Sequence, residues 1–594
     1  MKKRHDLSEE IITFASEKVM PPLAISLGSM RWNKTGTWRY IRPIYENKTP
    51  PCDEACPAGE DVEGVQYLCG QGKFEDAWRL ILEENPFPSV MGRVCSHPCE
   101  EACNRDQFDQ AISIHSVERF VGDYGLEHEM VPPRGAPRGA PRGRKEKVAV
   151  VGSGPAGLAC AYHLVRTGYR TLVLEAHPVA GGILRVGIPQ YRLPKDVLEA
   201  EIERIKDLGV DIQTNSPVDH DVLRKDLKGF DAIFIATGAH RSRKLNVPGE
   251  HAQGVMSGLQ FLIDLNLARK VEIGKKVAVI GGGNTAMDAA RSALRLGSEV
   301  VVVYRRSRAE MPAIPSEVEE ARREGIPIHF LAAPVRVIAE HGRVTKMECV
   351  RMRLGEPDSS GRRRPVPIEG SNFTMDVDTI LSAIGESPDL SFLSEDINTV
   401  GGSIATDGFG KTSREGVFAG GDVVDQPRTV AHAIGSGKMA AVAIDTFLRG
   451  KGIEAAIDTV KIGHRGSISM ERYLRGEIRF NGSKVVGFED INLAYFEPKD
   501  RVALPRESIA ESKRSFVEVN LGLSEEAVLT ESDRCFNCGV CNMCDNCWVF
   551  CPDISIWRKK EGFGYDIDYD HCKGCGICVE ECPREAMSME DEAR

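Results

Sequence analysis

The sequence predicts a multidomain α/β protein in which two nested Rossmann-like domains lie between two cysteine-rich domains. Its 594 residues correspond to about four domains at roughly 150 residues each. From residue 145 to about residue 450, strand-sized apolar runs alternate with helical patterns, which is typical of parallel α/β units. Sixteen of the 18 cysteines fall into two patches, six between positions 52 and 103 and ten between positions 535 and 582. Such patches in a long chain indicate metal binding rather than a disulfide scaffold.

Composition and charge exclude several classes of protein. Hydrophobic residues make up 42% of the chain and charged residues 27%, so a disordered chain is excluded. The net charge of −11 gives no electrostatic drive toward nucleic acid or anionic lipid. The longest apolar runs, such as residues 148–151 and 300–303, are far shorter than the about 20 residues of a membrane span. The charged first ten residues resemble no secretion signal, so we expect a cytoplasmic protein.

The first cysteine patch is irregular and lies among helical patterns, with a helix expected over residues 74–83. It reads Cys52-x3-Cys56 and, further on, Cys95-x3-Cys99-x3-Cys103. These five thiols, with Cys69, suffice for one [4Fe-4S] cluster and are too few for two with full thiolate ligation. A structural zinc site is the alternative. The Pro/Gly/Arg repeat that follows, residues 133–144, reads as a semi-extended linker rather than a nucleic-acid or partner-docking arm.

The next segment predicts a dinucleotide-binding turn. Residues 147–157 read KVAVVGSGPAG, in which an apolar strand meets Gly152-x-Gly154-Pro155-Ala156-Gly157 and a helical pattern follows. The next strand, residues 170–174, ends at Glu175, whose carboxylate suits ribose hydroxyls. The glycines allow a tight turn and close approach of the backbone to a pyrophosphate at the helix N-terminus.

The same pattern recurs with a different strand end. Residues 276–286 read KVAVIGGGNTA, giving Gly281-x-Gly283-Asn284-Thr285-Ala286. Where the first copy has Glu175, this copy has Arg305 and Arg306, which suit a 2′-phosphate through charge-assisted hydrogen bonds. We therefore assign FAD to the first turn and a nicotinamide nucleotide, NADPH in preference to NADH, to the second. The alternative for the two arginines is an exposed basic loop.

Further segments fit a protein with two dinucleotides. Thr237 and Gly238 follow an apolar strand at the crossing between the two domains, and Gly182 opens a loop that we expect to contact flavin. Gly421 and Asp422 follow a strand in the sequence GVFAGGD, which aims Asp422 at the ribityl chain. The helix that starts near Thr429 points its N-terminus at the isoalloxazine ring. Cys160 and Cys349 have no partner at short spacing, so we expect electrons to leave the flavin through the cysteine patches rather than a disulfide.

The second patch contains two runs with the spacing of two-cluster bacterial ferredoxins. In that arrangement the fourth cysteine of each run binds the other cluster, whereas zinc would not explain the paired runs. Cys535 and Cys538 extend the first run, where they either shift its register or serve another centre. The expected ligand sets are Cys541, Cys544, Cys547 and Cys582 for one [4Fe-4S] cluster, and Cys572, Cys575, Cys578 and Cys551 for the second.

Together these motifs resemble the small subunit of bacterial NADPH-dependent glutamate synthase and its relatives. The resemblance covers about residues 40–455 and rests on CDEACPAG (52–59), GRVCSHPCEEAC (92–103), GSGPAGLA, GGGNTAMD and YRRSRAEMPA (304–313). It implies a flavin-proximal cluster on Cys56, Cys95 and Cys99 with Glu118 as fourth ligand, unless Glu118 is only an exposed helix charge. The family's usual CxxC pair ahead of Cys52 is missing, so Cys52 and Cys103 either lack partners or complete the single cluster.

The length and the appended ferredoxin module look most like the flavoprotein partner of dissimilatory sulfite reductase. The resemblance implies an NAD(P)H:acceptor oxidoreductase with FAD, NADPH or NADH, two C-terminal [4Fe-4S] clusters and at least one N-terminal cluster. Its expected partner is a sulfite reductase, a ferredoxin or a glutamate synthase large subunit. The resemblance is also compatible with a homodimer of this chain. The alternatives are a glutamate synthase small subunit, an NAD(P)H:ferredoxin oxidoreductase that bifurcates electrons or not, and a redox scaffold or sensor. Hydride transfer needs no catalytic side chain beyond those that position the cofactors.

The predicted domain boundaries follow from these motifs. They are a helical iron–sulfur domain at 1–130, a linker at 131–144, the first part of the FAD domain at 145–246, the NAD(P)H domain at 247–380, the second part of the FAD domain at 381–455, a connecting or partner segment at 456–530 and a ferredoxin domain at 531–594.

Overall fold

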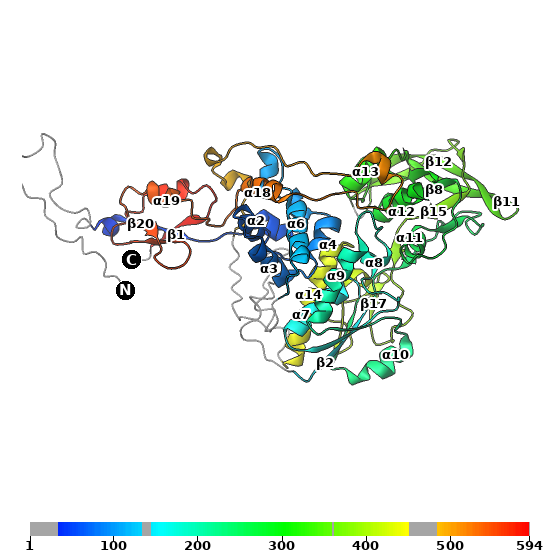
Figure 1. Cartoon of the computed structure of the whole chain (residues 1–594), viewed down its shortest axis with the longest axis horizontal. Coiled ribbons are helices and arrows are strands. Elements are labelled where there is room, and N and C mark those ends of the chain that lie inside the picture. Colours follow the sequence, from blue (N-terminus) through cyan, green and yellow to red (C-terminus); the bar gives the residue numbers. More distant parts are fainter. Residues whose placement is uncertain (1–33, 133–143, 359–360, 451–483, 593–594) are drawn as a thin grey trace, which may run out of the picture.

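The computed structural model describes residues 34–132, 144–358, 361–450 and 484–592. Figure 1 shows an elongated molecule with a small C-terminal module at one end, a helical domain in the middle and two sheet domains toward the other end. The predicted linker at 133–144 and the first part of the connecting segment lie almost wholly outside the described residues. Among the helices described, none is long and apolar enough to cross a membrane.

The helical domain is built from short helices around a small apolar core. In α3 (Phe74–Glu84), the residues that face this core recur at helical spacing, and Trp78 is fully buried. The expected helix at 74–83 is therefore confirmed with one further residue. The other helices are α1 (Pro51–Ala55), α2 (Val62–Gly70), α4 (Pro88–Val94), α5 (Pro98–Glu101), η4 (Asn104–Gln107) and α6 (Ile114–Glu127).

The first sheet draws strands from two separate stretches of the chain. All five of its strands are parallel, and β19 (Val417–Ala419) lies at its edge although it follows the second sheet domain in sequence. The two domains are therefore nested, as the sequence predicts. Helices α7 (Pro155–Arg166) and α14 (Val430–Leu448) pack against each other beside the sheet. The remaining elements are β2 (Lys147–Val151), β3 (Arg170–Leu174), β4 (Asp211–Gln213), β5 (Ala232–Ile235), α8 (Ile183–Val186), α9 (Lys195–Asp207), α10 (His220–Lys225) and η5 (Asp226–Gly229).

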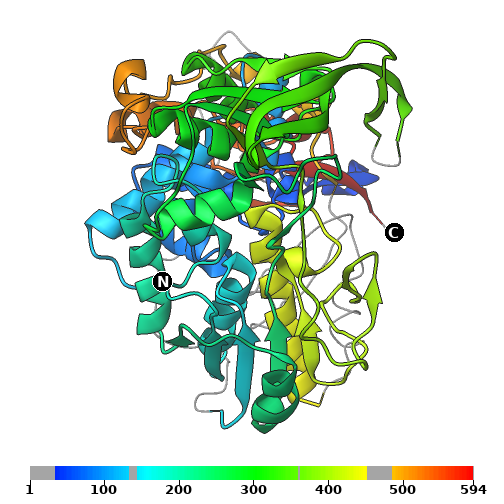
Figure 2. The same cartoon turned by 90° about the vertical axis from the view of Figure 1, so that its right-hand side faces the viewer.

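The second sheet repeats the parallel arrangement, with β15 (Thr379–Ser382) between β8 (Lys276–Ile280) and β7 (Val255–Ser257). Since β15 ends at Ser382, this domain extends two residues past the expected boundary at 380. An antiparallel sheet inserted before β15, which the sequence did not signal, projects from this domain in Figure 2. The remaining elements are α11 (Gly258–Asn266), α12 (Asn284–Arg295), β9 (Glu299–Tyr304), η6 (Arg308–Glu310), α13 (Pro315–Arg323), β10 (Ile328–Phe330), and in the inserted sheet β11 (Ala332–Glu340), β12 (Arg343–Pro357), β13 (Arg363–Pro367) and β14 (Phe373–Asp376).

Residues 484–534, called the strap below, run along the molecule in two directions. The strap reaches the second sheet domain, where Arg506 pairs with Glu320 at 2.6 Å, and returns to the helical domain, where α18 (Glu525–Asp533) packs on α2. Near the start of the strap, Val485 makes only an isolated bridge with Thr49, so residues 484–487 form no strand. The other strap elements are η8 (Phe488–Asp490), η9 (Leu493–Tyr495) and α17 (Ile509–Ser512). Short pieces elsewhere are η3 (Thr35–Trp38), β6 (Arg241–Ser242), β16 (Glu386–Ser387), β17 (Thr399–Val400), β18 (Ser403–Ile404) and η7 (Gly421–Val423).

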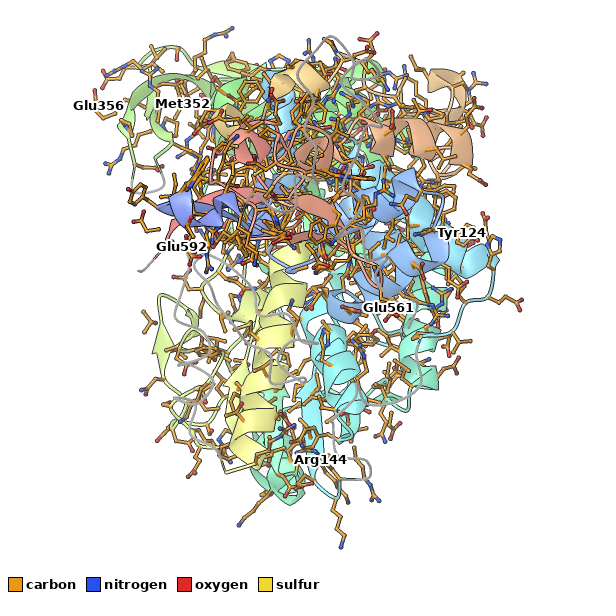
Figure 3. The ribbon with its side chains drawn as sticks, turned by 90° about the vertical axis from the view of Figure 1, so that its left-hand side faces the viewer. Tyr124, Arg144, Met352, Glu356, Glu561 and Glu592 are labelled. Atoms are coloured by element: carbon orange, nitrogen blue, oxygen red, sulfur yellow. The ribbon has the colours of Figure 1, made fainter. Side chains whose placement is uncertain are left out.

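The C-terminal module takes one strand from the segment ahead of the helical domain. β22 (Met587–Asp591) pairs antiparallel with β1 (Ile41–Tyr45), so that Tyr45 lies opposite Met587. Figure 3 looks at the molecule from this side, with Glu561 and Glu592 of the module labelled. The other elements are α19 (Asn546–Val549), β20 (Ile556–Arg558), β21 (Tyr565–Ile567) and α20 (Ile577–Glu580). This pairing joins the C-terminal module to the residues that lead into the helical domain.

Candidate functional site

The first glycine-rich turn has three glycines with three different roles. A β-carbon at Gly152, whose φ is +105°, would lie 2.4 Å from the Ala236 carbonyl oxygen. One at Gly157 would lie 1.9 Å from the Gly152 carbonyl oxygen, so this glycine allows α7 to pack close to the turn. One at Gly154 would meet no atom within 4 Å. The middle glycine therefore faces open space, where the backbone can approach a pyrophosphate.

That open space is a cavity of about 400 Å³ beside the first sheet. Nearly all residues predicted for the FAD site line this cavity. Of the predicted set, Gly157 and Gly421 are not part of the lining. The predicted residues in its lining are Gly152, Gly154, Pro155, Ala156, Glu175, Gly182, Thr237, Gly238, Asp422 and Thr429. Sequence reasoning missed His177, Ser216, His240 and Arg428, which also line the cavity and carry no motif that could have revealed them.

Polar groups in the cavity wall fit a bound dinucleotide. Glu175 is buried and accepts hydrogen bonds from the Ser153 backbone N (3.0 Å) and the His177 backbone N (2.8 Å), which fix its carboxylate beside the turn. Within the described part of the chain, Thr237 Oγ1 and His240 Nδ1 are buried without a hydrogen-bond partner. A buried polar atom left unpaired is costly, so both atoms favour a ligand with hydrogen-bonding groups. FAD supplies such groups along its whole length.

The far side of the cavity is formed by the start of α14. Thr429 caps this helix by accepting a hydrogen bond from the His432 backbone N at 3.2 Å. Burial raises the pKa of Asp422 to about 6, and the nearby Arg428 guanidinium limits the rise. The start of the helix and Arg428 both line the cavity, where they would favour the negative charge of a reduced flavin.

The second turn repeats the geometry of the first. Gly281 has φ +150°, and a β-carbon there would lie 2.1 Å from the Ala383 carbonyl oxygen. A β-carbon at Gly283 would meet nothing within 4 Å, as at Gly154. Asn284 Oδ1 accepts a hydrogen bond from the Ile314 backbone N at 2.9 Å, and Thr285 hydrogen-bonds Glu386. Ala286 is fully buried in the helix that follows.

The two arginines at the end of β9 are placed differently. Arg306 is buried, pairs with Asp358 at 2.6 Å and donates from Nε to the Arg363 carbonyl oxygen at 2.8 Å. Arg305 is exposed, and its nearest cations include Arg362 from the inserted sheet. Arg305 is therefore exposed with Arg362 within electrostatic range, while Arg306 holds the inserted sheet. The proximity of Arg362 was missed because nothing in the sequence shows which way the hairpin folds.

One iron–sulfur candidate in the helical domain lies in a cavity lined by Cys56, Cys95, Cys99 and Glu118. Glu118 is 8% exposed and accepts a hydrogen bond from Asn85 Nδ2 at 3.2 Å, so it is not an exposed helix charge. Burial raises the pKa of Glu118 well above its usual range. Three thiols and one carboxyl in a single cavity fit the ligand set that the resemblance implies.

This cavity is connected to the flavin cavity by α14. A β-carbon at Gly435 would lie 2.1 Å from the Pro57 carbonyl oxygen, so the helix packs directly on the segment after Cys56. One turn later, the fully buried Lys438 pairs with Glu84 at 2.7 Å and donates to the Ala58 carbonyl oxygen. The helix that begins at the flavin cavity thus fixes the position of the thiol cavity.

The C-terminal module gathers its eight regular cysteines into two interleaved sets. Cys541, Cys544, Cys547 and Cys582 line one cavity, and Tyr45 Oη lies 2.8 Å from Cys547 Sγ. In the other set, burial raises the pKa of the Cys578 thiol to about 12, with further contributions from Cys572, Cys551, Cys575 and Cys547. Cys582 therefore lies with the first run and Cys551 within electrostatic range of the second, which fits an exchange of fourth ligands between the runs.

Four further thiols lie together where the strap meets the helical domain. Cys52, Cys103 and Cys535 pack on the same apolar residues, and burial and the Cys535, Cys103 and Cys538 thiols raise the pKa of Cys52. The remaining three cysteines are buried elsewhere: Cys69 in the helical core, Cys160 in α7 and Cys349 in β12.

Two dinucleotide turns, a flavin-sized cavity and several thiol sets define an NAD(P)H-dependent iron–sulfur flavoprotein oxidoreductase. Family models agree with this class: pyridine nucleotide-disulphide oxidoreductase matches residues 146–437, dihydropyrimidine dehydrogenase domain II with a 4Fe-4S cluster matches 44–130, and a 4Fe-4S binding domain matches 565–588.

Curated relatives narrow the class. The NADP(+)-dependent formate dehydrogenase subunit beta of Moorella thermoacetica is 42% identical over 82% of this chain and 70% of that relative. The NADPH-Fe(3+) oxidoreductase subunit beta of Geobacter sulfurreducens is 38% identical over 84% and 76%. The glutamate synthase [NADPH] small chain of Escherichia coli K12 is 34% identical over 68% and 89%. The chain belongs to this family of NAD(P)H iron–sulfur flavoprotein electron-transfer subunits.

Proposed function

We propose that this chain accepts hydride from NADPH onto FAD and passes the electrons through iron–sulfur clusters to a protein partner, for which a dissimilatory sulfite reductase is our first candidate. The observation that carries the proposal is the order of the sites along the molecule. The nucleotide turn lies toward one end, the flavin cavity and the thiol cavity are joined by α14, and the ferredoxin-like module lies at the other end.

The residues of the chain contribute position and charge rather than acid–base chemistry. Bound FAD would supply the exchange between two-electron hydride chemistry and the one-electron chemistry of the clusters. Gly154 and Gly283 leave open space in which the backbone can approach and position the two dinucleotides. Arg428 and the start of α14 favour the extra negative charge of a reduced flavin. The exposed Arg305 presents positive charge to a 2′-phosphate, which supports NADPH over NADH.

The identity of the partner rests on resemblance and on the exposed end of the module. Cys544 and Cys575 are exposed, so the module offers a surface from which electrons can leave. The length of the chain and its ferredoxin module favour a sulfite reductase. The names of the relatives supply the competing partners, which are a formate dehydrogenase and a glutamate synthase large chain.

The test begins with the protein purified without oxygen from its native cells through an affinity tag. We expect NADPH to bleach the flavin and then the iron–sulfur absorbance in stopped-flow spectra, and a sirohaem protein to co-elute. Failure of the flavin to bleach would overturn the electron-transfer function. Recovery of a formate dehydrogenase, a glutamate synthase large chain or ferredoxin alone would replace the sulfite reductase with that partner.

A further inference from the structure

Seven cysteines remain after the regular thiol sets are assigned. Three of them are buried separately, and the other four come from two distant parts of the chain. Cys52 and Cys103 belong to the helical domain, whereas Cys535 and Cys538 follow the strap. The first pair lacks the upstream partners that the family pattern would provide, and the second pair exceeds the needs of the ferredoxin-like module.

The end of the strap is clamped onto the helical domain by buried charged groups. Glu531 is fully buried and accepts a hydrogen bond from the Ser113 backbone N at 2.8 Å. Arg534, also buried, pairs with Asp109 at 3.0 Å and donates to the Gln110 carbonyl oxygen at 2.7 Å. Buried pairs of this kind have little freedom, because a broken partner leaves an uncompensated charge. Cys535 is the next residue, so its position is fixed; Figure 1 shows α18 beside α2.

The thiols then meet in one place, where Cys538 is buried and the other three are half-buried. Cys52, Cys103 and Cys535 pack on Val62, Ile112 and Ile114. Cys538 completes the group from the same loop, within electrostatic range of Cys103 and Cys535.

Hydrogen-bond donors are also aimed at the sulfurs. The Asn537 backbone N lies 3.4 Å from Cys535 Sγ, and Asn104 Nδ2 lies 3.5 Å from Cys538 Sγ. The Asn537 side chain is itself held by Glu63 at 2.8 Å. N–H donors that point at sulfur stabilise thiolates and tune the potential of a cluster.

We propose that Cys52, Cys103, Cys535 and Cys538 are the ligands of a further [4Fe-4S] cluster, so that the chain holds four clusters and the strap replaces the missing CxxC pair. The proposal rests on the proposed electron-transfer function. It also connects the sites in sequence: Cys52-x3-Cys56 leads to the helical-domain cavity, and Cys538-x2-Cys541 leads to the ferredoxin-like module. The ligands of the proposed cluster are thus adjacent in sequence both to the helical-domain cavity near the flavin and to the ferredoxin-like module.

A zinc ion fits this site less well. Across the parts of the chain that the structure describes, no three His, Cys, Asp or Glu side chains converge closely enough to hold a single metal ion. A core of four irons and four sulfides is larger than one ion and spaces its thiolates further apart.

The experiment counts iron in the full chain after anaerobic reconstitution, with acid-labile sulfide, zinc and flavin measured on the same sample. We expect about sixteen irons per chain in the wild type and about twelve in Cys535→Ala/Cys538→Ala. The control variant Cys69→Ala/Cys349→Ala also removes two buried thiols and should keep about sixteen irons. A wild type with about twelve irons, or with one zinc at this site, overturns the proposal.

A second pair of variants separates this site from the ferredoxin-like module. Cys52→Ala/Cys103→Ala should lose the same four irons, so the quadruple variant should lose no more than either double variant. A quadruple variant that loses about eight irons would place Cys535 and Cys538 in the module and overturn the proposal. If a variant fails to fold, the iron count and the Mössbauer spectrum of the wild type still decide, because the proposal requires four clusters.

Flavin bleaching by NADPH is recorded separately from the iron count. Loss of bleaching with about sixteen irons present would contradict the proposed function and leave the cluster assignment standing.

Discussion

The two glycine-rich turns share one backbone plan and differ in what surrounds it. In both, the first glycine approaches a carbonyl of a neighbouring strand end and the second faces open space. The third position is Gly157 in one and Ala286 in the other, and a β-carbon at Gly157 would lie 1.9 Å from the Gly152 carbonyl oxygen, so only the first turn requires glycine there. The strand ends differ more, with a buried carboxylate at Glu175 and an exposed cation at Arg305. We therefore expect the turn geometry to allow each copy to bind a dinucleotide, and the strand end to select which dinucleotide binds.

The largest expected effect comes from filling the open space at the middle glycine. Gly154 and Gly283 have φ of −68° and −94° with extended ψ, so valine is allowed at both. Gly154→Val should lower the flavin content more than about tenfold, because the side chain occupies the seat of the pyrophosphate. Gly283→Val should keep the flavin and raise KM for NADPH more than about tenfold. Flavin absorbance and steady-state kinetics measure the two effects.

The control for both variants is Gly408→Val, in an exposed turn where a β-carbon also meets nothing within 4 Å. It should change neither the flavin content nor KM. If Gly283→Val instead released the flavin, the assignment of separate cofactors to the two turns would be wrong.

The sequence predicts the two turns of the candidate site better than the contacts that surround them. A turn of six residues between a strand and a helix is determined locally, so both copies, their order and Glu175 were predicted. The partners of Arg306 were not, because Asp358 reaches it only through the fold of a hairpin in the inserted sheet. The grouping of Cys535 with Cys52 likewise depends on where the strap returns to the helical domain. The buried ion pair between Arg534 and Asp109 determines that place.

An intermediate effect is expected from the exposed cation at the second strand end. Arg305→Ala should raise KM for NADPH about tenfold and leave KM for NADH nearly unchanged, since a charge-assisted hydrogen bond to a 2′-phosphate is worth about 1.5–3 kcal/mol. The neighbouring Arg308→Ala is the matched control and should alter neither value. Arg306→Ala should lower stability and affect both nucleotides alike, because its side chain holds Asp358. An equal effect of Arg305→Ala on both nucleotides would contradict the assignment.

The smallest effect concerns the carboxyl group in the flavin cavity and the pH. The pKa of Asp422 is raised to about 6 by burial, against an ordinary value of about 3.9 in an unfolded chain. The folded state therefore binds this proton more tightly, and its stability falls as the pH rises from about 4 to about 6. In flavin-depleted protein, Asp422→Asn should remove this dependence, so that between pH 5 and 7 the wild type loses about 1.3 kcal/mol at most relative to the variant. Urea unfolding at several pH values measures the difference. If the wild type and Asp422→Asn showed the same pH dependence of stability, the raised pKa of Asp422 would be excluded, and the carboxyl group would act in the cavity through its hydrogen-bonding groups alone.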